Sequence, residues 1–139
     1  VAVTPACGFV NPINAVFIGI IAALVCYLAV TVIKARLGYD DALDAFGVHG
    51  VGGIWGTIAV GLFAEKAVNA AGADGLFFGG AQLGPQLVMA AVAPLFAGVM
   101  TVVIFKLVDT LMCVRVAEKD EHIGLDLTQQ SEAAYTVIE

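Results

Sequence analysis

The sequence contains very few charged side chains for a chain of its length. Only 13% of its 139 residues are charged, 60% are hydrophobic, and the mean hydropathy is +0.97. A soluble domain has about 25% charged residues, so this composition excludes an ordinary soluble domain and indicates a membrane protein. Basic residues are scarcer than acidic ones, 6 against 12, which argues against nucleic acid as a partner.

Recognisable sets of groups for enzyme chemistry are also missing. The three cysteines (Cys7, Cys26 and Cys113) lie far apart and match neither a CxxC motif nor a zinc-ligand spacing. The sequence shows no nucleophile–base pair, no phosphate-binding loop and no pair of catalytic carboxylates. We therefore predict no catalytic residue, no metal, no cofactor and no enzymatic activity.

The first residues lack the features of a secretory signal peptide. No basic segment precedes the first apolar run, and Pro5 and Pro12 interrupt its start. The sequence also begins with Val1 rather than methionine. We interpret it as a fragment, or as the back half of a longer polytopic protein.

Three apolar stretches are long enough to cross a bilayer, at about residues 13–33, 42–64 and 86–108. A transmembrane helix needs about 20 such residues to cross a hydrocarbon core of ~30 Å. The predicted fold class is therefore all-α, a polytopic membrane helix bundle. Residues 1–112 form its transmembrane part, and the polar, acidic residues 113–139 form a tail.

The few basic residues predict how the spans are oriented. Five of the six lie in the first connection, at the end of the third span or after it, and Lys66 alone lies in the second connection. Because cytoplasmic segments are enriched in Lys and Arg, we place the first connection and the tail in the cytoplasm. The prediction is a multi-pass protein of the plasma (cell inner) membrane with a cytoplasmic C-terminus.

One histidine, His49, lies inside the second apolar stretch. Ionisable side chains at membrane depth are rare and mark ion paths, proton relays or ligand sites, so we favour a functional role. Two alternatives remain open. A neighbouring helix could satisfy the ring structurally, or His49 could be a haem ligand. The latter needs a second histidine, and His122 lies in the tail.

Small residues and a carboxylate accompany this histidine. Glycines recur at positions 47, 50, 53 and 56, and close helix packing in lipid favours such residues. We assign this packing role to four of the second span's glycines, namely Gly50, Gly52, Gly53 and Gly56. Asp44 lies at the cytoplasmic mouth, where a carboxylate suits a helix N-terminus, and Asp40 and Asp41 belong to the same capping region.

Three segments together resemble a known family. Residues 44–53 read DAFGVHGVGG, residues 4–10 read TPACGFV, and the tail contains GLD at 124–126 followed by EAAY at 132–135. In this order and spacing they resemble the ammonium transporter (Amt/Mep) family over essentially the whole chain. The related Rhesus proteins are a weaker match because they lack the tail pattern.

The resemblance implies the last three helices and the tail of an eleven-helix bundle that forms a homotrimer. It implies that ammonium is deprotonated, that ammonia crosses a hydrophobic pore lined by two histidines, and that the proton is relayed separately. His49 corresponds to the second pore histidine, with Ala45 and Phe46 beside it on the substrate path. Membrane lipid is the expected surrounding partner.

The tail has its own implied role. By the resemblance, four of its residues belong to a regulatory segment that can meet a PII-type signal protein, namely Gly124, Asp126, Glu132 and Tyr135. The family tail reads His-Gly where this chain has Gln130 and Ser131. That departure puts fine regulation by the tail in question, but not transport.

A different class of function stays open beside transport. Three spans are too few to enclose a pore, so the chain could be a non-conducting membrane anchor or an assembly subunit. Flux that depends on ammonium separates the two hypotheses, because only the transporter hypothesis predicts it.

Overall fold

The structure is a computed structural model that describes residues 1–133, and every regular element in this range is helical. Three of its helical stretches are long and apolar enough to cross a membrane, namely Pro12–Leu37, Phe46–Phe63 and Leu83–Leu111. The predicted fold class, an all-α polytopic membrane helix bundle, is confirmed.

The first long stretch consists of three consecutive segments, α1 (Pro12–Leu28), a π-helical turn η2 (Ala29–Ile33) and α2 (Lys34–Leu37). It begins where Asn11 caps the helix, because the Asn11 side chain accepts a hydrogen bond from the Asn14 N–H at 2.9 Å. Pro12 follows at the first position, where no backbone donor is needed. It ends at Gly38, whose left-handed φ of 63° suits a glycine.

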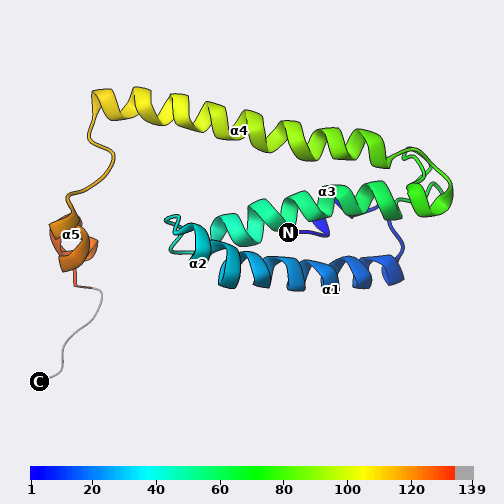
Figure 1. Ribbon diagram of the computed structural model, residues 1–139, viewed down its shortest axis with the longest axis horizontal. Coiled ribbons are helices and arrows are strands. Elements are labelled where there is room, and N and C mark those ends of the chain that lie inside the picture. Colours follow the sequence, from blue (N-terminus) through cyan, green and yellow to red (C-terminus); the bar gives the residue numbers. More distant parts are fainter. Residues whose placement is uncertain (134–139) are drawn as a thin grey trace, which may run out of the picture. The chain divides into compact units, whose positions relative to one another are not determined.

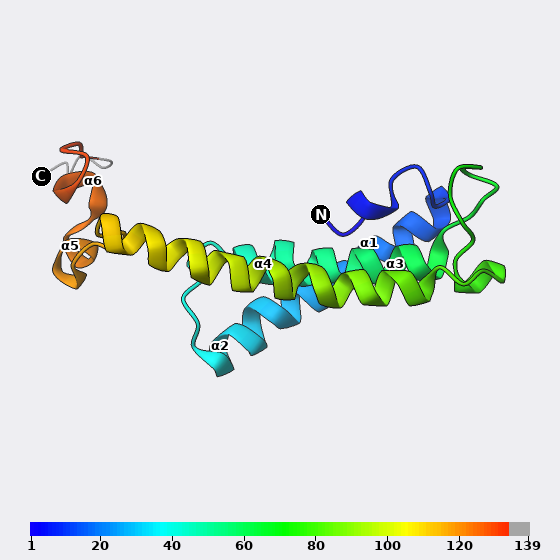
Figure 2. The ribbon, with the colours of Figure 1, turned by 90° about the horizontal axis from the view of Figure 1, so that it is seen from above.

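The second long stretch is a π-helical turn, η3 (Phe46–Gly50), continued by α3 (Val51–Phe63). In Figures 1 and 2, α3 runs antiparallel to α1 and crosses it. The buried residues at this crossing and at the N-terminal turn η1 (Thr4–Ala6) are nearly all small, namely Ala2, Ala6, Ile18, Ala59, Val60 and Ala64. Small side chains let the backbones approach closely.

Trp55 adds a hydrogen bond to this packing. Its indole Nε1–H donates to the backbone carbonyl of Ile18 at 3.0 Å, so α3 is tied to the middle of α1. Ile18 itself is fully buried, and Trp55 packs against the same cluster. The side chain thus both fills space and fixes the relative position of the two helices.

Three polar residues join the start of α1 to the end of α3. Asn11 Nδ2 and Asn14 Nδ2 both donate to Glu65 Oε1, the second bond at 3.2 Å. The Glu65 backbone N–H donates to the carbonyl of Phe9 at 2.8 Å. The residue that follows α3 is therefore bonded both to the start of α1 and to the segment before it.

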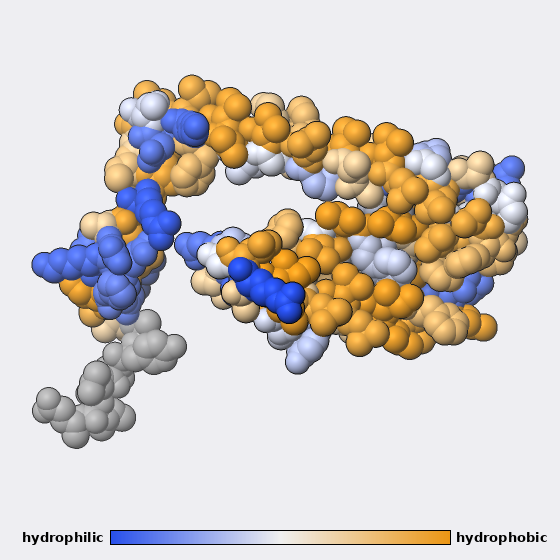
Figure 3. Space-filling view, viewed as in Figure 1, coloured by the Kyte–Doolittle hydropathy of each residue, from blue (hydrophilic) through white to orange (hydrophobic). Residues whose placement is uncertain are grey.

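The connection after α3 contains the short turn η4 (Leu76–Phe78) and leads into α4 (Leu83–Leu111), which continues through Pro94. No residue of α4 is buried against the described part of the chain, and apolar residues cover the visible face of the long helices in Figure 3. The chain divides into two compact units, Val1–Ala97 and Gly98–Glu139. The second unit holds the end of α4 and the short helices α5 (Glu118–Ile123) and α6 (Leu125–Thr128).

Candidate functional site

His49 lies on the π-helical turn η3, near the start of the second long helical stretch. Within this turn the Val51 N–H bonds to the carbonyl of Phe46, five residues back, where an α-helix would bond four residues back. Single π turns inside α-helices occur often at functional sites. The imidazole is exposed and makes no hydrogen bond to any residue in the range 1–133. The alternative that a neighbouring helix satisfies the ring therefore finds no hydrogen-bond partner within residues 1–133.

The opposite side of the turn is closed by the first long helix. Gly47 is buried, and a Cβ added there would lie 2.6 Å from Cγ2 of Val30. The thiol of Cys26 donates to the carbonyl of Val48 at 3.8 Å, the length of a weak sulfur hydrogen bond. Val30 belongs to η2, so the π turns η2 and η3 contact each other. The backbone beside His49 is packed on one side while the imidazole remains accessible.

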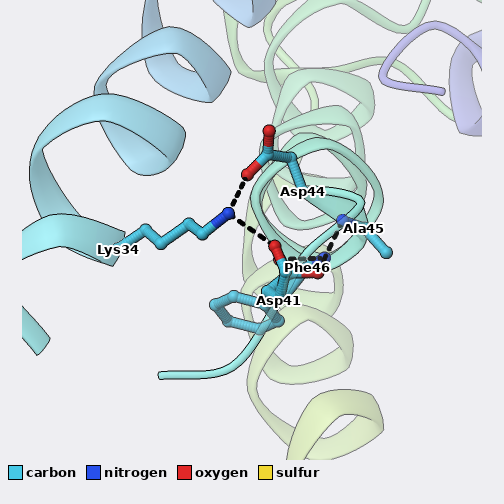
Figure 4. Close-up of polar contacts among 5 residues, drawn as sticks. All are labelled: Lys34, Asp41, Asp44, Ala45 and Phe46. Atoms are coloured by element: carbon cyan, nitrogen blue, oxygen red, sulfur yellow. Dashed lines mark hydrogen bonds and ion pairs between the residues drawn. The ribbon is translucent and has the colours of Figure 1, made fainter. Parts of the chain in front are cut away.

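Lys34 and two carboxylates hold the loop that enters this turn, as Figure 4 shows. Lys34 Nζ lies 2.6 Å from Asp44 Oδ1 and 2.5 Å from the backbone carbonyl of Asp41. The carboxylate of Asp41 accepts from the backbone N–H groups of Ala45 at 2.8 Å and Phe46 at 2.9 Å. These are the first free donors of the helical stretch, which a cap normally satisfies.

Asp41 caps the second helix, as expected of a member of the capping region, but the expectation that the Asp44 carboxylate also serves the helix N-terminus is wrong. Asp44 has a left-handed backbone with φ of 55°, and its carboxylate bonds to Lys34 instead. Its backbone carbonyl still accepts the first helical bond, from the Val48 N–H at 2.9 Å. The proposed place of Asp44 at the mouth of a substrate path stays a prediction.

Phe46 precedes His49 on η3, Ala45 lies directly before this turn, and both of these predicted path residues are exposed. The ring of Phe46 meets Tyr39 edge-on at 5.7 Å between centroids. A Cβ at Gly50 would approach this ring to 2.7 Å, so Gly50 makes room for Phe46. Two predicted path residues, Phe46 and His49, therefore lie on one turn.

The remaining glycines of this helix face different neighbours. A Cβ at Gly52 would lie 3.0 Å from the thiol of Cys26 on α1. A Cβ at Gly56 would overlap the backbone carbonyl of Ala2. Gly53 has nothing within 4 Å among the described residues. Gly52 and Gly56 thus lie at contacts inside this chain, and the packing role of Gly53 stays a prediction.

Comparison with known proteins supplies the family. The family model described as "Ammonium Transporter Family" matches residues 1–135. An ammonium transporter of Bacillus subtilis is 52% identical over 136 residues, and ammonium transporter Amt1 of Archaeoglobus fulgidus is 44% identical over 136 residues. Each alignment covers 97% of this chain. The chain belongs to the ammonium transporter family.

The alignments cover only part of the relatives. This chain spans about a third of their length, 34% in both cases and 29% for ammonium transporter 1 of Dictyostelium discoideum. The resemblance read from the sequence motifs is confirmed. With three apolar helices and this family, the chain is a membrane protein, and its relatives are named as transporters rather than enzymes.

The tail residues that resemble the transporter tail come together in the second unit. Gly124 has a φ of 112°, and a Cβ there would lie 2.6 Å from Asp126 Oδ1, so this position suits glycine. The backbone N–H of Glu132 donates to the carbonyl of Asp126 at 2.9 Å. Tyr135 lies outside the described residues. The regulatory role of these residues stays a prediction.

The sequence reasoning missed two groups that the structure places at the ends of the helix pair. Lys34 was read only as a topology signal, although it lies four residues before the left-handed Gly38 and can turn back toward the carboxylates that follow. Glu65 received no role from the sequence. The signal for Glu65 was its position directly after an apolar span, with two asparagines opening the preceding one.

Proposed function

We propose that this chain supplies the last three spans of an ammonium transporter, and that His49 lines the pore of the complete subunit. The observation that carries the proposal is an ionisable imidazole on a π turn of an otherwise apolar helix long enough to cross a membrane. Family membership supports ammonium as the substrate. An ionisable ring in such a helix needs a functional reason, because charged groups are expensive at membrane depth.

In this proposal ammonia, rather than ammonium, passes His49. A dry apolar path makes a bare cation costly, whereas a neutral amine can cross with one or two hydrogen bonds. A neutral imidazole carries one donor and one acceptor, so it can bond to ammonia without carrying a charge. Ala45 and Phe46 add apolar surface beside the ring. The proton released from ammonium is relayed separately, with Asp44 at the cytoplasmic mouth.

The cost of moving a cation onto an apolar path also explains selectivity for ammonium over potassium. A potassium ion has no proton to lose, so it would pay the full desolvation penalty on an apolar path. Ammonium avoids the penalty by leaving its proton behind. Rejection of potassium is therefore the property that most directly reports on a dry pore lined by His49.

The wider setting is proposed with it. The complete protein is a homotrimer in the plasma membrane with its C-terminus in the cytoplasm, and the distribution of basic residues supports this orientation. Gly124, Asp126, Glu132 and Tyr135 belong to a regulatory tail, and a PII-type signal protein is its proposed partner. The hydrogen bond from the Glu132 N–H to the Asp126 carbonyl supports this grouping of the tail residues.

The test is made in the complete transporter subunit, reconstituted in vesicles, with His49→Ala and with His122→Ala as the matched control. His122 lies outside the spans, near Glu118 at 3.9 Å. Loss of one pore hydrogen bond should change ammonium uptake or the ammonium-to-potassium ratio about tenfold. The control should behave as the unaltered protein does.

Two results would contradict the proposal. Unchanged uptake and selectivity in His49→Ala would remove His49 from the pore. If the unaltered, complete protein shows no ammonium-dependent flux, the alternative of a non-conducting membrane anchor or assembly subunit is favoured instead.

A further inference from the structure

Lys34 makes two bonds to the loop before the second long helical stretch, and we call this pair of bonds the Lys34 anchor. Its ammonium group donates to two acceptors that lie three residues apart, the Asp41 carbonyl and the Asp44 carboxylate. The side chains of Lys34 and Asp44 are only 28% and 36% exposed. Charge-assisted hydrogen bonds are stronger than neutral ones, and here one ammonium group makes two of them.

The two acceptors are the two ends of one tight turn. The backbone N–H of Asp44 donates to the same Asp41 carbonyl at 3.1 Å, so this oxygen accepts from both Asp44 and Lys34. Asp44 takes a left-handed backbone with φ of 55°, a conformation that is strained for a residue other than glycine. Lys34 therefore spans a strained turn and holds both of its ends.

The same two aspartates also bond to the first N–H groups of the second long helical stretch. The Asp41 carboxylate holds the N–H groups of Ala45 and Phe46, and the Asp44 carbonyl holds the N–H of Val48. Val48 immediately precedes His49. The N–H groups of Phe46 and Val48 belong to η3, which carries the histidine, and Ala45 directly precedes it. The bonds from this loop therefore set where η3 begins (Figure 4).

We propose that Lys34 is a positioning residue for His49, an inference that rests on the pore role given to His49 under the proposed function. The π turn holds one residue more than an α turn. If the anchor opens and the turn rewinds as α-helix, the residues before the rewound bond rotate by about 100° relative to those after it. In this proposal Lys34 stabilises the π turn η3 and thereby fixes the direction in which the His49 imidazole points.

Arg36 offers a matched control on the same helix. It is also basic, lies two residues after Lys34, and its exposed side chain has no hydrogen bond or ion pair within residues 1–133. Arg36→Met removes the same charge from the same connection without touching the anchor. Any effect of charge alone on orientation or on attraction of ammonium is therefore common to Arg36→Met and Lys34→Met.

The first measurement is amide hydrogen exchange in the complete subunit, which does not depend on transport. Lys34→Met should raise exchange at residues 44–48 about tenfold, and leave α3 beyond Trp55 unchanged. Lys34→Arg, which keeps a cation of similar reach, should restore most of the protection. Arg36→Met should match the unaltered protein within about twofold.

The second measurement is transport by the same proteins in vesicles. Lys34→Met should change the ammonium-to-potassium selectivity about tenfold, and Lys34→Arg should recover most of it. If Lys34→Met does not accumulate in the membrane, Lys34→Gln, which removes the charge and shortens the reach of the side chain, replaces it in both measurements.

The outcomes separate this inference from the function it rests on. Unchanged amide hydrogen exchange in Lys34→Met would refute the claim that the bonds of Lys34 hold residues 44–48. Raised exchange with unchanged selectivity overturns the positioning role and leaves Lys34 as a structural residue. If the unaltered complete protein carries no ammonium, the proposed function fails and the positioning role fails with it, while the exchange result still decides whether the anchor exists.

Discussion

Replacing Glu65 by alanine should loosen the junction between the start of α1 and the end of α3. Glu65 Oε1 accepts from both Asn11 Nδ2 and Asn14 Nδ2, so one substitution removes two bonds that join distant parts of the chain. The backbone bond from Glu65 N to the Phe9 carbonyl does not involve the side chain and remains available. The effect is therefore confined to the side-chain contacts.

The size of the effect follows from charge and exposure. A hydrogen bond to a charged group is worth about 1.5–3 kcal/mol when it is sheltered. Here both asparagines and Glu65 are half-buried, so water can replace part of the loss, and both bonds share one oxygen. We expect about 2 kcal/mol for Glu65→Ala and about 1 kcal/mol for Glu65→Gln, whose amide oxygen still accepts.

Hydrogen exchange in the complete protein measures this local opening. A loss of about 2 kcal/mol corresponds to about 30-fold faster exchange at residues 9–15 and 64–69, and about 1 kcal/mol to about fivefold. Lys66→Ala is the control, because its exposed side chain makes no bond within residues 1–133, and its backbone N–H keeps its bond to Asp74. Equal effects of Gln and Ala at position 65, or an equal effect of Lys66→Ala, would refute the reasoning.

Two further substitutions test the crossing of α1 and α3 by unfolding of the complete protein in detergent mixtures. Trp55→Phe keeps an aromatic ring but removes the donor to the Ile18 carbonyl, so stability should fall by about 0.6–1.5 kcal/mol; no change would mean that the bond contributes nothing. Gly56→Ala places a Cβ into the Ala2 carbonyl, and an overlap worth about 1–3 kcal/mol should outweigh a gain in helix propensity of about 1 kcal/mol. Gly52→Ala is its control, since the nearest atom there is a side-chain sulfur that can move, and destabilisation equal to that of Gly56→Ala would contradict the packing argument.

The long helices were predictable because their signal is strong and local. An uninterrupted apolar run after Asn11-Pro12 admits hardly any structure other than a capped helix, and the structure has that helix. Residue Asp44 shows where such reasoning stops. Three carboxylates precede the second helix, and any of them could cap it by spacing alone. Asp41 caps it because Lys34 and a left-handed backbone turn Asp44 away, which involves a neighbouring helix.

The candidate site was predictable only in part for a related reason. The motif at residues 44–53 identified the family and singled out His49, but no propensity distinguishes a π turn from an α turn. The wide turn depends on contacts made from α1 and η2, such as Val30 against Gly47 and Cys26 against Val48. Pairings between segments 17 to 22 residues apart are absent from any local pattern.

The π turn at 46–50 also has a consequence for how this helix tolerates changes in length. It holds one residue more than the α turn that could stand in its place. A relative that lacks one residue between the anchoring aspartates and Val51 can close the turn as ordinary α-helix and keep every later residue, Trp55 included, in register with α1. Insertions and deletions should therefore be absorbed at this turn, so an alignment gap beside His49 need not mean that the rest of the helix has shifted.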